Sequence, residues 1–200
     1  MCNLYSMTSN EAALRRLFGV AGAGGVNWPV LSAIFPGQSA PIIRIRDGDR
    51  RLDPVVWGFP PPPKGNRPVT NVRNLKSPFW RQWLHDHRCL IPATAFCEWQ
   101  ATTPRKTPIW FRTLDQAVFC FAGIWRPTAD GAVFAMLTTE ANALVRPVHA
   151  QAMPVILAAS DADIWLGGDA AAALALARPY PAQNMEICQQ GGRAYHPTVE

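Results

Sequence analysis

Polar capping residues followed by apolar positions at helical spacing predict three helical stretches in this chain. The first begins at a capping box formed by Thr8 and Glu11, and it ends at Gly19. The second begins at Ser77-Pro78, because proline is favoured in the first turn of a helix. The third is the alanine-rich stretch 169–177. Helices therefore account for only a small part of the sequence.

Most of the remaining apolar positions form short runs that are typical of strands. Two runs within residues 42–57 flank Asp47-Gly48, a pattern that favours a hairpin. Residues 19–40 and the prolines at 60–63 are predicted to be loops. Further strands are predicted at 88–92, 95–99, 108–114, 117–125, 132–138 and 153–157. This pattern predicts an α+β fold, in which residues 1–200 form a single domain with an antiparallel, barrel-like sheet and a few peripheral helices.

Composition excludes several classes of protein. Hydrophobic residues make up 48% of the 200 positions and charged residues 16%, which indicates a packed globular chain and not a disordered one. No run of 18 apolar residues occurs, and polar residues interrupt the N-terminal segment where a signal peptide would be apolar. We therefore expect a cytoplasmic protein that does not enter a membrane.

Cysteine usage indicates neither a disulfide framework nor a zinc site. The chain has five cysteines, an odd number, and no C-x-x-C pair. We interpret Cys89, Cys97, Cys120 and Cys188 as packing residues.

Positive charge is concentrated in the first two thirds of the chain. Residues 1–126 hold 16 Lys or Arg against 7 Asp or Glu, whereas residues 127–200 hold 3 against 7. Sixteen of the 19 basic residues are arginine, which grips phosphate bidentately and stacks on bases. This favours a polyanionic partner, nucleic acid before membrane. The alternative is that a GC-rich genome replaced lysine by arginine on a solvated face.

Cys2 is an unusual position for a cysteine. If Met1 is removed, the mature chain begins with a 1,2-aminothiol, whose amine has a pKa of about 7.7–8.0 and whose thiol has a pKa of about 8.5. Such an amine attacks an aldehyde to form an imine, and the thiol then closes a five-membered thiazolidine. The alternative is an accidental cysteine at a frayed terminus.

Two internal clusters also contain candidate site residues. Asn71 and Arg73 are two positions apart, so they share a face if that segment is extended. Glu98 lies between Cys97 and Trp99, where a carboxylate either forms a structural ion pair or has the raised pKa of an acid–base group.

His149 precedes an apolar strand and is a candidate for chemistry, although a lone histidine is usually structural. We interpret His85, His87 and His196 as surface residues.

Several segments together resemble one known family, the SRAP (SOS response-associated peptidase) family. They are MCNLYS at the start, TNVRN at 70–74, RCLIPATAFCEW at 88–99, AGIW at 122–125 and TTEANALVRPVHAQAMPVIL at 138–157. The resemblance spans nearly the whole chain, in the family's order. It implies the SRAP fold and a sensor that crosslinks its mature N-terminal cysteine to abasic sites in single-stranded DNA, as part of the SOS DNA-damage response. It implies no metal ion and no organic cofactor.

The resemblance also implies a role for each candidate residue. Cys2 would be the nucleophile, through its amine and its thiol. Asn71 would hold the N-terminal residue, and Arg73 would grip a phosphate beside the lesion. Glu98 would exchange protons with the amine and the sugar hydroxyl, and His149 would assist opening of the deoxyribose ring.

The chain departs from the family pattern in two places near these residues. Asn74-Leu75 stands where many members have a glutamate after the matched arginine. The run from His149 to Pro154 is one residue longer than the usual His-x-Arg-Met-Pro and lacks its arginine.

Three classes of function stay open from the sequence. The first is the abasic-site sensor, with autoremoval of Met1, possible lyase-type chemistry, a monomeric state and association with the nucleoid in a bacterial cell. The second is a thiol peptidase or amidohydrolase that uses Cys2 with His149 and Glu98. The third is a noncovalent single-strand-binding module that uses arginines and aromatic residues.

Overall fold

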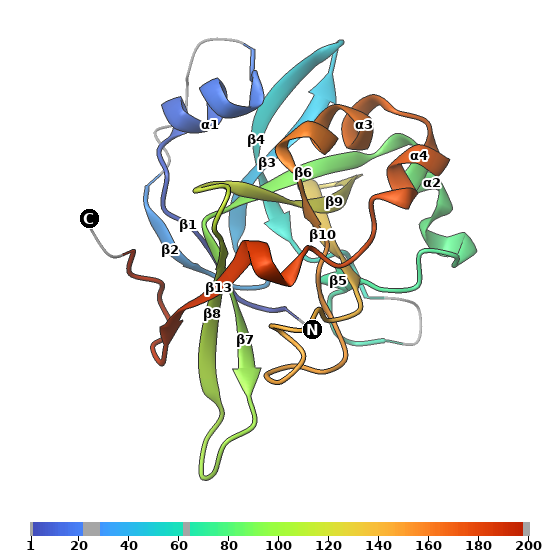
Figure 1. Cartoon of the computed structure of the whole chain (residues 1–200). Helices are drawn as coiled ribbons and strands as arrows, with labels where there is room; N and C mark the ends of the chain where they lie inside the picture. The colour runs from blue at the N-terminus through green and yellow to red at the C-terminus, as the bar shows by residue number, and fades with distance from the viewer. Residues whose placement is uncertain (1, 22–28, 62–64, 198–200) are drawn as a thin grey trace.

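Five strands close into a barrel at the centre of the protein (Figure 1). The computed structural model describes residues 2–21, 29–61 and 65–197. The barrel strands are β3 (Ser39–Arg46), β4 (Asp49–Trp57), β6 (Arg88–Ala93), β9 (Phe119–Thr128) and β10 (Gly131–Thr139). Their order is β10-β4-β3-β6-β9, and antiparallel pairing of β9 with β10 closes the ring. The predicted α+β class with a barrel-like sheet is confirmed, although β4 and β10 pair in parallel, which we did not predict.

A second sheet of five strands continues from the barrel. Its strands are β1 (Tyr5–Met7), β2 (Leu31–Ile34), β7 (Ala95–Gln100), β8 (Thr107–Thr113) and β13 (Met185–Gln190), in the order β13-β8-β7-β1-β2. The chain passes from barrel strand β6 to β7 through Thr94 alone. Thr94 forms hydrogen bonds there with Ser6 and Thr8, including a 3.0 Å contact between the Ser6 and Thr94 hydroxyl oxygens. These polar contacts fix the corner between the two sheets.

Three very short strands attach to the ends of β9 and β10. They are β5 (Asn71–Val72), β11 (Met153–Pro154) and β12 (Ile156–Leu157). The β5 strand pairs in parallel with Met136 and Leu137 of β10, and β11 pairs with Thr138 and Thr139, the last two residues of the same strand. The end of β10 therefore brings together two segments that are about 80 residues apart in the sequence.

The helices lie around this β structure (Figure 1). They are α1 (Glu11–Phe18), α2 (Pro78–Asp86), α3 (Ala162–Gly167) and α4 (Ala170–Ala175), with 3₁₀ turns at Ala159–Asp161 and Ala182–Asn184. The α1 helix ends at Gly19 as predicted, where φ is 59°. The predicted cap was wrong, because Asn10 and not Thr8 accepts the Ala13 amide.

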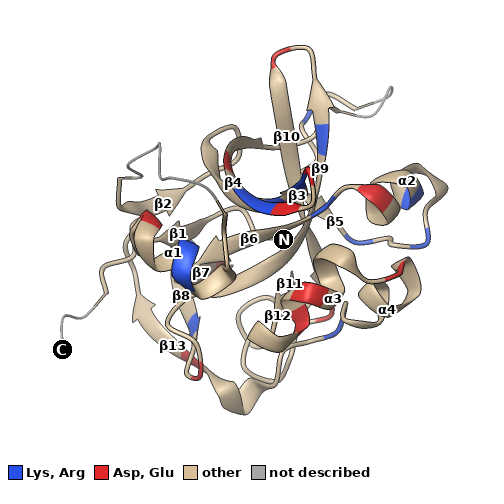
Figure 2. Ribbon diagram, turned by 90° about the horizontal axis from the view of Figure 1, so that it is seen from above, with Lys and Arg blue, Asp and Glu red and all other residues tan. Residues whose placement is uncertain are grey.

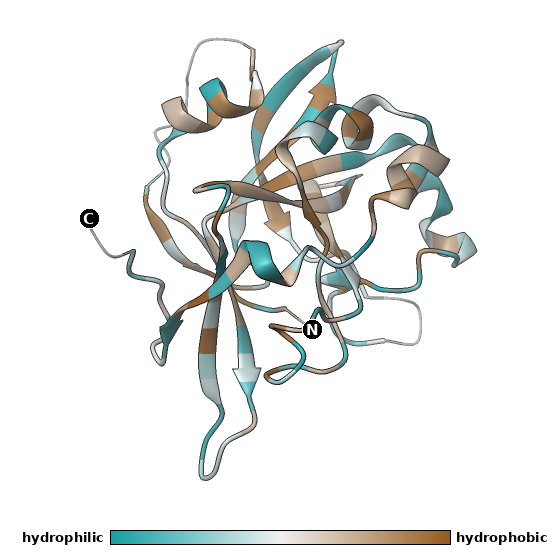
Figure 3. Cartoon of the chain, viewed as in Figure 1, coloured by the Kyte–Doolittle hydropathy of each residue, from teal (hydrophilic) through white to brown (hydrophobic). Residues whose placement is uncertain are grey.

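The core is built from aromatic and β-branched side chains of both sheets (Figure 3). Tyr5 of β1 packs edge-on against Trp57 of β4 and Phe121 of β9, with ring centroids 5.2 and 5.7 Å apart. Gly123 is required in β9, because a β-carbon there would lie 2.6 Å from the Ile91 Cδ1 atom. Aromatic packing thus joins the N-terminal strand to the barrel.

Most strand predictions are confirmed, and the loop predictions are partly wrong. The six strands expected after residue 88 are all present, the last one divided into β11 and β12, and residues 39–57 form the expected hairpin. Residues 31–34 and 39–40 were predicted as loop but belong to β2 and β3, and β13 was not predicted. Residues 22–28 and 62–64, which include two of the expected loop prolines, lie outside the described residues.

The sequence asymmetry in charge is also visible in space. Figure 2 shows basic residues together with acidic ones on α1 and the β3–β4 hairpin, whereas α3 is acidic. An ion pair between Arg50 of β4 and Asp163 of α3 joins the two groups. Within the described ranges, no helix combines the length and apolarity needed to cross a membrane.

His87 is not the surface residue that we predicted. Its ring lies between Trp83 and Trp125, with centroid distances of 5.0 and 4.7 Å. The guanidinium carbon of Arg126 lies 5.3 Å from the Trp83 centroid and that of Arg44 lies 4.0 Å from the Trp125 centroid, so a cation contacts each of the two tryptophans. Burial lowers the pKa of His87, and Arg44 contributes in the same direction. The stack therefore favours the neutral imidazole.

We expect the protein to lose stability when His87 becomes protonated. A histidine whose pKa is lowered by folding contributes stability that is fully present above its usual pKa of 6.5 and is lost as the pH falls from there through the lower pKa of the folded protein. The variant His87→Phe keeps an aromatic ring but cannot be charged, so its melting temperature should fall less than that of the wild type between pH 7.5 and pH 5. His85→Phe, at an exposed position on the same helix, is the control. Parallel pH profiles for wild type and His87→Phe would contradict this reading.

Candidate functional site

The backbone of Cys2 is held by the β5 strand. The Asn71 side chain, which is 8% exposed, donates a hydrogen bond of 2.8 Å from Nδ2 to the backbone carbonyl of Cys2. The same Nδ2 lies 2.9 Å from the Thr70 hydroxyl oxygen, which fixes the amide orientation. Pairing of Asn71 with Met136 anchors the segment on the barrel. The barrel thereby determines where the Cys2 backbone lies.

The Cys2 side chain points inward. The residue is fully buried, and its Sγ atom lies 3.4 Å from the Leu4 carbonyl oxygen and 3.9 Å from that of Cys97. Burial raises the pKa of the Cys2 thiol well above its usual value, and the charge of Glu98 raises it further. The sulfur is therefore a protonated thiol at neutral pH. Its protonation is electrostatically linked to that of Glu98.

Glu98 lies on β7, the strand that pairs with β1. The hydrogen bond from the Cys97 amide to the Leu4 carbonyl, 2.9 Å long, continues this pairing toward the N-terminus. Glu98 is only 1% exposed, and burial raises the pKa of its carboxyl group to about 7. A carboxyl group with this pKa is suited to exchange protons at neutral pH. The structure thus places an acid–base group next to the buried Cys2 thiol.

This buried carboxyl group should reduce stability at alkaline pH. Its pKa rises from 4.5 to about 7 on folding, so the stability it contributes is complete below 4.5 and is lost as the pH rises through 7. The Glu98→Gln variant should therefore melt above the wild type at pH 8, and the difference should shrink at pH 5. The exposed substitution Glu140→Gln is the control and should change neither profile. A Glu98→Gln protein that melts below the wild type at pH 8 would refute this expectation.

His149 lies in a tight turn immediately before β11. Its Nδ1 atom lies 3.1 Å from the Ala152 carbonyl oxygen and 3.3 Å from the Ala152 nitrogen. Burial lowers the pKa of His149, and the positive charge of Lys106 adds to the effect. The ring is therefore neutral at pH 7. Met153, which follows this turn, is held in place because it pairs with Thr139 at the end of β10.

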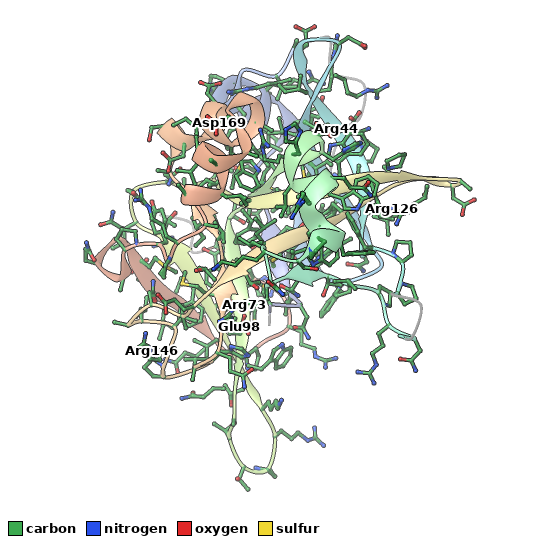
Figure 4. The ribbon with its side chains drawn as sticks, turned by 90° about the vertical axis from the view of Figure 1, so that its right-hand side faces the viewer. Arg44, Arg73, Glu98, Arg126, Arg146 and Asp169 are labelled. Atoms are coloured by element: carbon green, nitrogen blue, oxygen red, sulfur yellow. The ribbon has the colours of Figure 1, made fainter. Side chains whose placement is uncertain are left out.

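Arg73 braces the same turn from the other side. Its Nη1 atom donates a hydrogen bond of 2.5 Å to the Gln151 carbonyl oxygen. Arg73 is exposed, and it follows directly after β5. Figure 4 shows Arg73 and Glu98 in the same part of the molecule, above the projecting β7–β8 hairpin. The contact of Arg73 with the 149–152 turn could not be predicted from the sequence. Its acceptor is a main-chain carbonyl, that of Gln151, which every residue type has.

The structure therefore gathers the candidate residues in two linked groups. In the first group, Asn71 and Glu98 lie close to Cys2. The hydrogen bond from Arg73 to the Gln151 carbonyl links this group to the turn that carries His149. Of the other cysteines, Cys89, Cys97 and Cys120 are buried, and Cys188 is partly exposed. The Cys97 backbone contacts the Cys2 sulfur. Among the described residues, no three His, Cys, Asp or Glu side chains are arranged to hold a metal ion.

Comparison with known proteins identifies the family. The sequence profile described as SOS response associated peptidase (SRAP) matches residues 1–191. The chain belongs to the SRAP family. The matching SRAP relatives include two from Bacillus subtilis, the "abasic site processing proteins" YoqW and YoaM. Each is 31% identical to this chain over 173 residues, which is 78% of this chain and 76% or 75% of theirs.

Solved structures show the same fold. A protein from Bordetella bronchiseptica superposes with a TM-score of 0.76 at 24% identity, over 98% of this SRAP chain and 100% of its own. A protein from Bacteroides thetaiotaomicron gives a TM-score of 0.76 at 20% identity, over 92% and 90% of the two chains. At these identities the superpositions support the SRAP architecture and carry no argument about activity.

Proposed function

We propose that this protein captures abasic sites in single-stranded DNA by a covalent thiazolidine crosslink to mature Cys2. The hydrogen bond from Asn71 to the Cys2 carbonyl carries this proposal, because it fixes the N-terminal residue beside a buried carboxyl group. Membership of the SRAP family supports it, and so do the names of the Bacillus relatives, which are abasic site processing proteins.

The proposed reaction has three steps. The cyclic abasic sugar opens to its aldehyde when its C1 hydroxyl loses a proton and its ring oxygen gains one. The Cys2 amine then adds to the aldehyde carbon and expels water, which leaves an imine. Finally the Cys2 sulfur bonds to the imine carbon, and the thiol proton moves to the nitrogen. No oxidant, reductant or cofactor is needed in any step.

Each proton transfer has a candidate residue close by. Glu98, whose pKa is about 7, can take the thiol proton and return a proton to the nitrogen. His149, neutral because of its burial, can assist the opening of the sugar ring. Removal of Met1 must come first, since only then does Cys2 carry a free amine. We propose that the same site performs this removal by hydrolysis of the Met1–Cys2 peptide bond.

The environment of the sulfur favours this chemistry over an ordinary thiol peptidase. Such a peptidase needs a thiolate, usually produced by a histidine hydrogen-bonded to the thiol. The described contacts of the Cys2 Sγ atom are two backbone carbonyls, and its pKa is raised. A neutral thiol that reacts after the imine has formed fits these surroundings better.

The exposed Arg73 connects the reaction centre to the DNA backbone in this proposal. One of its nitrogen atoms is used by the Gln151 carbonyl, and a guanidinium has further donors. We propose that these donors contact a phosphate beside the lesion while the first holds the His149 turn.

A denaturing gel tests the proposal directly. Protein lacking Met1 is incubated with a single strand that carries one abasic site and, separately, with the undamaged strand. We expect a slower-migrating, denaturation-resistant species with the abasic strand only. Equal noncovalent retention of both strands in a native gel, with no species that survives denaturation, would favour the binding module and overturn the proposal.

The role of His149 can be separated from simple positioning. Ring opening matters only while the abasic sugar is cyclic, so His149→Ala should slow adduct formation on a natural abasic strand. The defect should shrink on a strand that carries a permanently open aldehyde. Time courses on both strands provide the measurement, and equal slowing on the two would remove ring opening from the role of His149.

A further inference from the structure

The loop that carries His149 contains a buried asparagine that has no role in the chemistry proposed above. Residues 140–152 join β10 to β11, and Arg146, labelled in Figure 4, lies on this loop. Asn142, near the start of the loop, is only 8% exposed. Because ordering a loop costs conformational entropy, its position depends on the bonds that hold it. The contacts of Asn142 therefore bear on where His149 lies.

The Asn142 side chain uses both ends of its amide group. Its Oδ1 atom accepts hydrogen bonds from the backbone amides of Leu144 and Val145, at 3.1 and 2.9 Å. Its Nδ2 atom donates to the Tyr180 carbonyl oxygen at 2.8 Å and contacts the Met185 sulfur at 3.2 Å. Two amide donors face Oδ1 and a carbonyl oxygen faces Nδ2, so the side-chain amide fits in only one orientation. It is a fixed link between the loop and a distant segment.

Hydrogen bonds continue from Asn142 to His149. The Val145 amide is held by Asn142, and the Val145 carbonyl oxygen accepts the backbone amide of His149 at 2.9 Å. Together with the bond to Tyr180, these make three consecutive hydrogen bonds that end at the His149 backbone. At the other end of the turn lies the hydrogen bond from Arg73. The segment that carries His149 is thus fixed on both sides.

Tyr180, at the far end of this series of hydrogen bonds, is itself held in place. The residue is buried, with 6% of its surface exposed. Its hydroxyl group donates a hydrogen bond of 2.7 Å to Asp115 Oδ2 and accepts one of 2.9 Å from the Gln116 side chain. Both partners belong to the turn between β8 and β9. The position of the His149 turn is therefore tied to the β structure and not only to its own loop.

We propose that Asn142 is a positioning residue that holds His149 where its ring can assist the opening of the abasic sugar. This inference rests on the proposed function, in which His149 performs that step. Asn142 exchanges no proton and makes no contact with the DNA. It limits the positions open to the His149 backbone, and a misplacement of about 1 Å can cost an enzyme roughly 10²-fold in rate. Adduct formation on a cyclic abasic sugar therefore depends on the link from Asn142 to Tyr180.

The variant Asn142→Ser breaks this link. A serine hydroxyl can still accept a hydrogen bond from a backbone amide of the turn, but it is too short to reach the Tyr180 carbonyl. The matched control is Asn184→Ser. Asn184 is partly exposed, follows Tyr180 by four residues, and its side chain forms no hydrogen bond with another described residue. Melting temperatures verify that both variants are folded.

Rates of adduct formation are measured on a natural abasic strand and on a strand that carries a permanently open aldehyde. We expect Asn142→Ser to be slower on the natural strand, by up to roughly 10²-fold, and to keep a rate near that of the wild type on the open strand. The double variant Asn142→Ser/His149→Ala should be no slower than His149→Ala, because both changes remove the same contribution. Asn184→Ser should react like the wild type on both strands.

A second measurement needs no DNA. Burial lowers the pKa of the His149 ring in the folded protein. If Asn142 holds the turn, Asn142→Ser should expose the ring and move its pKa back toward the usual value of about 6.5, as followed by an NMR titration. Asn184→Ser should leave the titration unchanged. A wild-type protein that forms no adduct would refute the proposed function, and the titration would still show whether Asn142 holds the turn.

Two results would overturn the inference. One is equal slowing of Asn142→Ser on the two strands, which a general loss of structure would cause. The other is a rate and a His149 pKa that match those of the wild type. If Asn142→Ser does not fold, Tyr180→Phe replaces it, because this change releases the Tyr180 ring from Asp115 and Gln116 and keeps the carbonyl group. The same selective slowing on the natural strand is then expected, and its absence overturns the inference.

Discussion

Replacing Cys2 with alanine is expected to abolish the denaturation-resistant adduct with abasic single-stranded DNA. The variant keeps a free terminal amine, which can still form an imine, but an imine hydrolyses unless the sulfur closes the ring. The adduct should therefore disappear on a denaturing gel, whereas noncovalent binding of the strand should persist. Cys188→Ala is the matched control, because Cys188 is a partly exposed thiol outside the proposed centre.

A block on the amine provides the complementary measurement. A tag fused ahead of Cys2 leaves the thiol intact but converts the amine into an amide, so it should abolish the adduct as fully as Cys2→Ala does. An undiminished adduct in either protein would exclude the aminothiol mechanism. An adduct that survives only in the tagged protein would mean that the thiol acts without the terminal amine.

The second large effect is expected from Glu98→Gln, which keeps the size of the side chain but cannot exchange a proton. General acid–base groups supply roughly 10²- to 10⁴-fold in rate, so adduct formation should slow by a factor in that range. In the wild type the rate should rise with pH through about 7, where the buried Glu98 carboxyl group ionises. The variant should lose this inflection and keep only the later one that belongs to the Cys2 amine.

Binding must be measured in parallel to assign this effect to chemistry. The affinity of Glu98→Gln for a non-reactive abasic strand should stay near the wild-type value, because the 1% exposed carboxyl group does not face the DNA backbone as an exposed residue would. Glu186→Gln, at a partly exposed ion pair, is the control and should keep the wild-type rate. A Glu98→Gln protein with the wild-type rate and pH profile would remove Glu98 from the mechanism.

Much of the fold was predictable because its strands carry local signals. Short apolar runs marked the strands from 88 to 157, and Asp47-Gly48 marked the hairpin turn. The strands that were missed lack such signals. Leu31–Ile34 and Met185–Gln190 lie at the two edges of the second sheet, with mixed polarity along their length, so only their partners make them strands.

The sequence offers candidate residues for a site, but it does not predict their contacts. Cys2, Asn71, Arg73, Glu98 and His149 were selected by residue type and by a family resemblance. The brace from Arg73 to Gln151 and the stack around His87 depend on main-chain atoms or on neighbours distant in sequence.

The pairing of Asn71 with β10 has a consequence for the order in which the chain folds and matures. Cys2 and Asn71 are 69 residues apart, and Asn71 is itself anchored on β10 at Met136. During synthesis the N-terminus therefore emerges long before the strand that will hold it, and such distant pairings form late in folding. If removal of Met1 depends on the hydrogen bond from Asn71 to Cys2, the reactive aminothiol is produced only in chains whose barrel has already closed. Unfinished chains would then be protected from reacting with other cellular aldehydes.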